Sequence, residues 1–255
     1  MKGRPVSTVV ALLVLFGCIQ PLGAQARSAE QIIRHAEQSV FPDAFVMRAT
    51  LVTRESGKES TRMEMAVSFK RNVGSRIELL QPPRSRGIRF LQKQAALWLF
   101  NPQAGTNQAI RLSPKAAFQG SVFSNSDVGD PQYSTDYTMS LRGTEMLDHP
   151  DLGSVTAAVL EGTARDAAVA YSKVKLWVRP GDDMLLKGEY YAKSGLLFKR
   201  VLFTRIVEMA GRERPTVIRM ASLDQPDRES VLTITSLEDR PDLPDALFNL
   251  SALTR

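Results

Sequence analysis

Hydrophobic and polar residues alternate with a period of two along most of the chain beyond residue 43. In the first such segment the apolar positions are Phe45, Met47, Ala49 and Leu51. A strand with one face on the core and one in water has this period, whereas a helix would scatter the same residues around its circumference. The alternation returns in later segments, at 62–70, 172–178, 196–208, 216–222 and 231–237.

Turn sequences rich in Pro, Gly and Asp separate several of these segments, at 180–183, 193–195 and 224–227. Because there is no alternating β-α-β rhythm, we predict a mainly β protein with a strongly curved antiparallel sheet of about ten or eleven strands. Such a sheet must close into a barrel or curl around something that covers its apolar face. No break in composition marks a second domain, so residues 27–255 are predicted to form a single domain.

Few helices are predicted. Ser28 and Gln31 have the spacing of a capping box, and the apolar residues that follow at helical spacing are Ile32, Ile33, Ala36 and Val40. The sequence Phe41-Pro42-Asp43 ends this helix. Two shorter helices are predicted around 113–118 and 245–248. A strongly curved sheet with so little helix to fill it leaves apolar space, which is a site for an apolar guest.

Residues 1–26 have the three parts of a secretory signal peptide. Lys2 and Arg4 give a positive start, an apolar stretch follows, and Ala24-Gln25-Ala26 is a small-x-small cleavage site. We therefore expect a soluble periplasmic protein. One alternative is an uncleaved anchor helix, and another is a lipoprotein, since Leu15-Phe16-Gly17-Cys18 resembles a lipobox in which Cys18 would be lipidated.

Composition and charge exclude several classes of protein. The chain is 43% hydrophobic and 24% charged, which is typical of globular proteins. The single cysteine rules out a disulfide framework within the chain or a zinc ribbon. Without residues 1–26 the chain has 31 basic and 27 acidic residues and no polybasic block. Nucleic acid binding needs a concentrated basic stripe, so no nucleic acid partner is expected.

Candidate catalytic groups are sparse, so the protein is predicted not to be an enzyme and to need no metal or cofactor. No Gly-x-Ser-x-Gly elbow is present. His149 lies in a predicted turn, where we expect it to be solvated. Asp127, Asp130 and Asp136 cluster in a polar stretch, where turn caps are the expected role and a glycosidase-like carboxylate pair is the alternative.

Methionines on the apolar faces of the first strands, at Met47, Met63 and Met65, suit a surface that accepts variable apolar shapes. The alternative is ordinary core packing. From the alternation we predict that the following residues line an apolar cavity: Met47, Leu51, Met63, Met65, Phe69, Ile77, Leu79, Leu97 and Leu99. A slip of one residue would place the opposite set inside.

The most distinctive stretch is Leu97-Trp98-Leu99-Phe100-Asn101-Pro102, whose four large apolar residues must be covered on both faces. Together with 110–113, with 120–127 and with the ending Leu243-Pro244-Asp245-Ala246-Leu247-Phe248, it resembles the LolA-like outer-membrane lipoprotein-sorting proteins. The resemblance implies a half-open antiparallel β-barrel of the LolA/LolB type, with helices as a lid over an apolar cavity. Trp98 and Phe100 are expected beneath a lid, and Arg111 is a candidate lid or headgroup contact.

The same resemblance implies a periplasmic carrier of lipoprotein or lipid acyl chains, and some relatives are thought to work beside transporters of the resistance-nodulation-division type. An inner-membrane transporter and an outer-membrane acceptor are therefore expected partners. Two other classes of function remain open. One is a lipid-anchored envelope scaffold or transporter subunit, and the other is a periplasmic hydrolase.

Overall fold

The structure is a computed structural model that describes residues 27–94, 96–129 and 132–254. The predicted signal peptide and Cys18 lie outside these residues. The described chain forms one antiparallel sheet of 13 strands. The strands are β1 Ala44–Glu55, β2 Lys58–Lys70, β3 Gly74–Gln81, β4 Arg89–Lys93, β5 Ala96–Phe100, β6 Ile110–Leu112, β7 Tyr137–His149, β8 Gly153–Ala164, β9 Lys173–Arg179, β10 Met184–Tyr191, β11 Leu197–Met209, β12 Arg212–Ser222 and β13 Arg228–Asp239.

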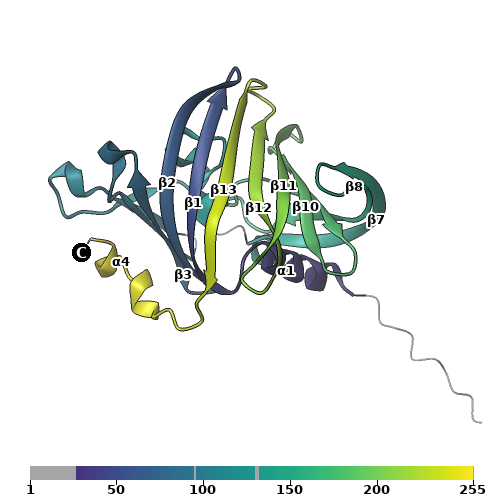
Figure 1. Cartoon of the computed structure of the whole chain (residues 1–255), viewed down its shortest axis with the longest axis horizontal. Helices are drawn as coiled ribbons and strands as arrows, with labels where there is room; N and C mark the ends of the chain where they lie inside the picture. Colours follow the sequence, from purple (N-terminus) through teal and green to yellow (C-terminus); the bar gives the residue numbers. More distant parts are fainter. Residues whose placement is uncertain (1–26, 95, 130–131, 255) are drawn as a thin grey trace, which may run out of the picture.

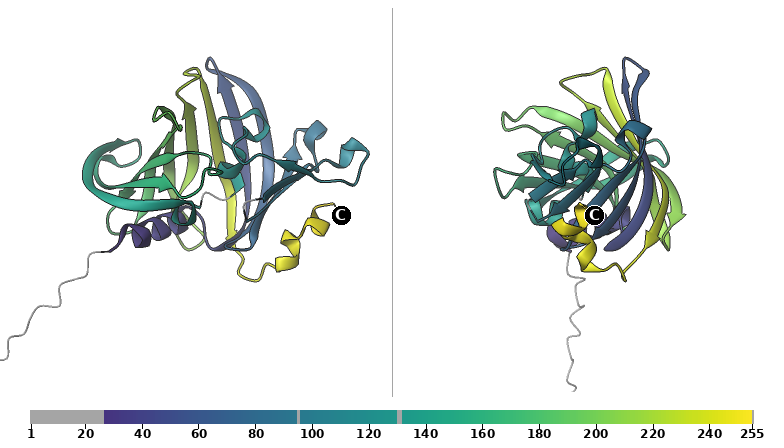
Figure 2. Two further views of the ribbon diagram at one scale, coloured as in Figure 1. Left: turned by 180° about the vertical axis from the view of Figure 1, so that it is seen from behind. Right: turned by 90° about the vertical axis from the view of Figure 1, so that its left-hand side faces the viewer.

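The strand order is β6-β5-β4-β3-β2-β1-β13-β12-β11-β10-β9-β8-β7. Strands β1 and β13, close to the two ends of the chain, therefore pair in the middle of the sheet, and β6 and β7 lie at its two edges. The sheet curls around an interior (Figures 1 and 2). The predicted curved, mainly β architecture is confirmed, with 13 strands in place of ten or eleven.

The inner face of the sheet is the one predicted from the alternation. Met47 pairs with Val67, Val67 with Ile77 and Ile77 with Phe90, so their side chains lie on one face. All four are at most 2% exposed and belong to one core cluster. The alternation of apolar residues therefore located the core face correctly.

Strands β7 and β8 are not among those predicted from the alternation. In β7 the residues between 141 and 146 are all exposed, so this part of the strand has no dry face and no period of two. Its position at the edge of the sheet explains why polar residues are tolerated on both sides. These two strands account for much of the difference in strand number.

Helix α1, Ala29–Val40, begins with the predicted capping box and ends at Phe41. Its apolar face, with Ile33 and Ala36 fully buried, packs into the core formed by the sheet. The other end of the helix is held by Arg214, whose Nη1 donates to the carbonyls of Gln38 at 2.6 Å and Ser39 at 3.3 Å. A guanidinium there satisfies free carbonyls and complements the helix dipole.

The helix predicted around 113–118 is wrong. Residues 113–116 instead form a turn, in which the Ala116 N–H donates to the Ser113 carbonyl at 3.2 Å. The chain then pairs with the residues that follow, because the Phe118 N–H donates to the Phe123 carbonyl at 2.8 Å and the Asn125 N–H donates to the Ala116 carbonyl at 2.9 Å. The segment from β6 to β7 instead contains one 3-10 turn and two short helices, which are η3 Phe118–Gly120, α2 Asn125–Gly129 and α3 Tyr133–Asp136. Two further 3-10 turns, η1 Pro83–Ser85 and η2 Pro102–Ala104, lie earlier in the chain.

The C-terminal segment covers part of the outer face of the sheet, beside β3 (Figure 1). It contains η4 Asp245–Phe248, where a short helix was predicted, and α4 Leu250–Leu253. Phe248 is fully buried, and a Cβ added at Gly74 would lie 3.3 Å from its Cβ. Phe100 and the partly buried Trp98 pack with Phe248 in one hydrophobic cluster, so the C-terminal segment is what covers them.

No helix in the described part of the chain has both the length and the apolar character needed to cross a bilayer.

Replacing Arg214 with Met should lower the free energy of unfolding by about 2–3 kcal/mol, the usual range for losing a charged hydrogen-bond donor to buried acceptors. Arg214 is 4% exposed, and burial lowers its pKa to about 10, so it is still charged at neutral pH. Urea denaturation would measure the loss. Arg219→Met is the matched control, because Arg219 makes an exposed ion pair with Glu229 and should cost less than about 1 kcal/mol. Equal losses in the two variants would contradict the role given to Arg214.

Candidate functional site

A cleft of about 430 Å³ lies between the two halves of the sheet that curl toward each other. One wall comes from β4 and β5, and the other comes from α3, the start of β7, the β8–β9 loop and β10. The residues that line it are Gln92, Gln94, Ala96, Leu97, Pro114, Ser126, Asp127, Gln132, Tyr133, Thr135, Asp136, Tyr137, Asp166, Ala168, Val169, Ala170, Tyr171 and Tyr190. The cleft therefore combines aromatic and aliphatic surface with three carboxylates.

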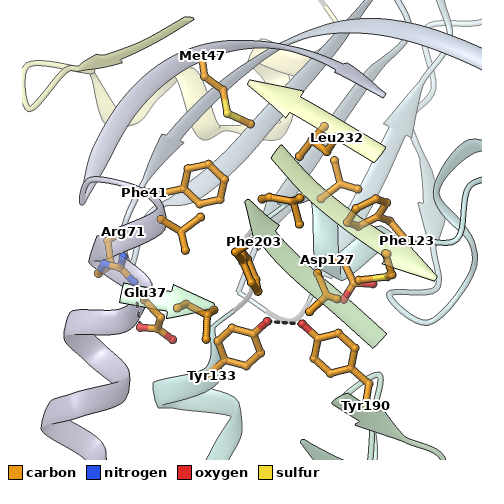
Figure 3. A pocket seen from close by; sticks show the side chains of 16 residues that line it. Glu37, Phe41, Met47, Arg71, Phe123, Asp127, Tyr133, Tyr190, Phe203 and Leu232 are labelled. Carbon is orange, nitrogen blue, oxygen red and sulfur yellow. Dashed lines mark hydrogen bonds and ion pairs between the residues drawn. The ribbon is translucent and has the colours of Figure 1, made fainter. Parts of the chain in front are cut away.

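A second, smaller cavity of about 40 Å³ lies under α1 and α2, inside the curved sheet (Figure 3). Most of its wall is apolar and includes Phe41, Met47, Phe203 and Leu232. Asp127, Tyr133 and Tyr190 line both cavities. These three side chains therefore form the partition between the polar cleft and the apolar interior.

The residues predicted to line an apolar cavity are placed in three ways. Met47 lines the small cavity and Leu97 lines the cleft. Leu99 is partly buried against the main core. The remaining six are at most 5% exposed in that core and line neither cavity; they are Leu51, Met63, Met65, Phe69, Ile77 and Leu79. Contact of these residues with a ligand stays a prediction.

Arg111, the candidate headgroup contact, is exposed on β6 and lines neither cavity. Its neighbour Trp98 on β5 packs under the C-terminal segment, on the outer face. Arg111 pairs with Trp98 in the strand register, so it also belongs to the outer face of the sheet.

A group of four tyrosines forms the wall of the cleft nearest the interior. The rings of Tyr171 and Tyr190 stack with centroids 4.6 Å apart, and those of Tyr133 and Tyr190 are parallel at 6.5 Å. The hydroxyls of Tyr133 and Tyr190 lie 2.5 Å apart, and the Tyr137 hydroxyl donates to the Tyr171 carbonyl. Burial raises the pKa of all four phenols, so they are neutral at physiological pH.

Asp127 connects this group to a buried cation. Its Oδ2 accepts hydrogen bonds from the Tyr171 hydroxyl at 2.6 Å and from the Ser124 backbone at 2.7 Å. Lys199, which is 7% exposed, donates to the same Tyr171 hydroxyl at 3.1 Å. Burial lowers the pKa of Lys199, while the charge of Asp127 raises it. Tyr171 thus bridges two opposite charges inside the protein.

The predicted role of Asp127 as a cap is confirmed at the start of α2, because its carboxylate accepts from the Ser124 backbone while its own backbone N–H donates to the Ser124 hydroxyl at 3.3 Å. Asp136 lines the same cleft, and burial raises its pKa. Asp130 lies outside the described residues. None of the four tyrosines was predicted as a site residue, because they come from α3, β7, the β8–β9 loop and β10, with no common spacing in the sequence.

Glu37 links α1 to α3 at the rim of the small cavity. Its carboxylate accepts hydrogen bonds from the backbone and the hydroxyl of Ser134, both at 2.8 Å, and lies 3.5 Å from Arg71 (Figure 3). The Glu37 side chain is 3% exposed. A buried carboxylate with these partners fixes the helix against the segment that covers the interior.

The prediction that His149 is solvated is wrong. His149 is 3% exposed, with Nε2 2.9 Å from the Phe203 carbonyl and Nδ1 accepting from the Asp151 backbone. Only Nε2 can carry the hydrogen in this arrangement. His35, the other histidine, pairs with Asp183. Within the described residues, no group of three His, Cys, Asp or Glu side chains is placed to hold a metal ion.

Replacing Glu37 with Gln should change how stability depends on pH. Burial raises the pKa of Glu37 above its ordinary value of 4.5, although the bonds from Ser134 and the charge of Arg71 lower it. The folded protein therefore binds this proton more readily than the unfolded chain does. The stability gained from binding this proton is fully present below pH 4.5, and it is lost as the pH rises through the raised pKa of Glu37.

As the pH is lowered from neutral to 4.5, the urea concentration at the unfolding midpoint should therefore increase for the native protein relative to Glu37→Gln, because the variant binds no proton at this position. Asp136 is present in both proteins, so its contribution cancels when one pH profile is subtracted from the other. The same pH dependence in both proteins would contradict a raised pKa for Glu37.

Comparison with known proteins gives the chain's relatives. A family described as "Uncharacterized protein" matches residues 71–255. No curated protein matches the chain. A LolA superfamily protein from Nitrosomonas europaea, NE2245, is 30% identical, with a TM-score of 0.80 over 89% of this chain and 100% of that one.

Two more distant structures share the fold. A putative outer membrane lipoprotein-sorting protein domain from Vibrio parahaemolyticus is 19% identical, with a TM-score of 0.75 over 89% of this chain and 98% of that one. A DUF1329 family protein from Desulfovibrio piger is 22% identical, with the same TM-score over 88% and 97%. The half-open barrel expected from the sequence is thus confirmed. Because the identity to the Nitrosomonas protein reaches 30% over that protein's full length, the chain belongs to the LolA superfamily.

Proposed function

We propose that this protein is a periplasmic carrier that binds the acyl chains of a lipoprotein or lipid and transfers them between envelope components without catalysis. The observation that carries the proposal is the cleft of about 430 Å³ between the converging halves of the sheet. Its volume lies within the usual range of small-molecule sites. The cleft adjoins an apolar interior, and a structure with the same fold is described as a putative outer membrane lipoprotein-sorting protein domain.

The physical task of such a carrier is to keep hydrocarbon out of water. Moving one methylene group of an acyl chain from water to an apolar environment lowers the free energy by about 0.8 kcal/mol. In the cleft, Leu97, Val169 and Ala170 supply aliphatic surface, and the tyrosine rings supply aromatic surface. An acyl chain placed along these residues would point toward Phe203 and Leu232 in the small cavity.

The small cavity of about 40 Å³ has room for little more than water, so deeper entry of a chain requires the covering helices to move. The predicted set on β1, β2 and β3 would then form the floor of the binding site. Release follows when an acceptor binds the chain more tightly than this protein does, because equal affinities shift nothing. The Glu37–Ser134 contact between α1 and α3 is one of the bonds that such an opening must break.

The proposed partners follow from the same function. They are an inner-membrane transporter of the resistance-nodulation-division type and an outer-membrane acceptor. The signal-peptide pattern of residues 1–26 supports a periplasmic location, with a lipoprotein anchored through Cys18 as the alternative. Neither histidine lines the cleft or the small cavity, so the alternative function of a hydrolase would depend on the carboxylates of the cleft.

Replacing Val169 with Asp should reduce the lipid that copurifies with the protein by at least about tenfold, because a carboxylate in the cleft must be desolvated against hydrocarbon. Val169 is a partly buried loop residue between β8 and β9, so the substitution should leave the sheet intact. Mass spectrometry of organic extracts, from protein prepared without detergent, would measure the lipid.

The matched control is Leu196→Asp, since Leu196 is 71% exposed in the turn between β10 and β11 and lies outside both cavities. It should retain lipid as the native protein does. Extracts of the native protein with no acylated molecule would contradict the carrier function. A stable protein partner without lipid would favour an envelope scaffold, and hydrolysis of a lipid or glycan that is lost in Asp127→Ala or Asp136→Ala would favour a hydrolase.

A further inference from the structure

The Tyr133–Tyr190 pair holds one more hydrogen-bond donor than the described residues use. Two phenols carry two O–H groups, and the 2.5 Å contact between their oxygens employs one of them. The second hydroxyl hydrogen has no acceptor in the described part of the chain. Tyr133 is 5% exposed and Tyr190 is 3% exposed, but both line the cleft, so water that enters the cleft can accept this hydrogen. A ligand that displaces this water must accept the hydrogen in its place, because a buried donor without an acceptor is costly.

The position of the pair identifies which part of a ligand would meet it. Both tyrosines line both cavities, so their hydroxyls lie where the cleft meets the apolar interior. Figure 3 shows the two hydroxyls facing each other below Phe203, with Asp127 close by. An amphiphile that spans this junction has hydrocarbon on one side and its polar head on the other. The group at the boundary is the linkage between head and chain.

We propose that the Tyr133–Tyr190 pair donates a hydrogen bond to the carbonyl oxygen of an ester- or amide-linked acyl chain, and thereby selects acylated ligands over chains that lack a carbonyl. The inference rests on the proposed carrier function and adds to it the chemical group that is recognised. A carbonyl oxygen offers the acceptor that the second hydroxyl needs, and it carries no charge into the buried site.

The charges around the cleft favour a neutral linkage over a free fatty acid. Three carboxylates, Asp127, Asp136 and Asp166, line the cleft, and its described lining includes no Lys or Arg. Lys199 lies behind Tyr171 and is already hydrogen-bonded to it. A ligand carboxylate beside Asp127 would meet like charge, whereas an ester or amide would not.

The test compares two neutral lipids that differ at the linkage, monopalmitoylglycerol and its ether analogue hexadecylglycerol, titrated into the full mature protein. The native protein should bind the ester about three- to tenfold more tightly, as expected for one hydrogen bond. In the double variant Tyr133→Phe/Tyr190→Phe this preference should fall to about one, while the affinity for the ether stays within about twofold.

Tyr191→Phe is the matched control. Tyr191 follows Tyr190 on β10 but lines neither cavity, and its hydroxyl donates to the Glu189 carboxylate at 3.0 Å, so the ester preference should survive its loss. An independent measurement on the native protein uses an ester with an isotope-labelled carbonyl. Its infrared stretch should move to lower wavenumber on binding, relative to the same ester in hydrocarbon solvent.

Three outcomes would overturn the inference. They are equal affinities of the native protein for the two lipids, an ester preference that the double variant retains, and an unshifted carbonyl band. In each of these cases the carrier function itself would still stand. Failure of the native protein to bind either lipid is a different result, because it would overturn the proposed function and this inference together.

Discussion

The structure depends on one constraint, which is that a single curved sheet has a continuous apolar inner face that must be kept from water. A fully closed barrel would solve this by joining its edges, but here β6 and β7 stand at opposite ends of the strand order. Side chains from α1, from the segment between β6 and β7 and from the β8–β9 loop cover the face instead. The cleft is the part of the gap that this cover leaves open.

Polar contacts hold the cover in place. Arg214 binds the carbonyl end of α1, Glu37 joins α1 to α3, and Asp183 accepts from Arg27 near the start of the same helix. Arg214, Glu37 and Asp183 are each at most 6% exposed, so breaking one of these contacts leaves a buried charge with fewer partners. The cover is therefore held in a defined position by directional bonds, while the hydrophobic contact beneath it is less specific.

The parts of this structure that were predictable from sequence are those set by local periodicity. The alternation around Met47 and Met65 gave the strands and the inner face, and Ser28 with Gln31 gave the start of α1. The site depends on contacts between distant segments. Tyr133 and Tyr190 meet across 57 residues, and the burial of His149 depends on the Phe203 carbonyl, 54 residues away. Spacing in the sequence carries no signal for such contacts.

The packing of the inner face limits where a guest can bind at low cost. Leu51, Met65 and Leu79 are fully buried against their neighbours, so a chain inserted among them must first displace packed side chains. A chain lying in the cleft displaces none of them. The residues that decide affinity should therefore be those at the gap between the sheet's two halves, and Leu97, which was predicted from alternation, is one of them. A charge introduced at Met65 should therefore destabilise the folded protein, so such a variant does not measure lipid binding.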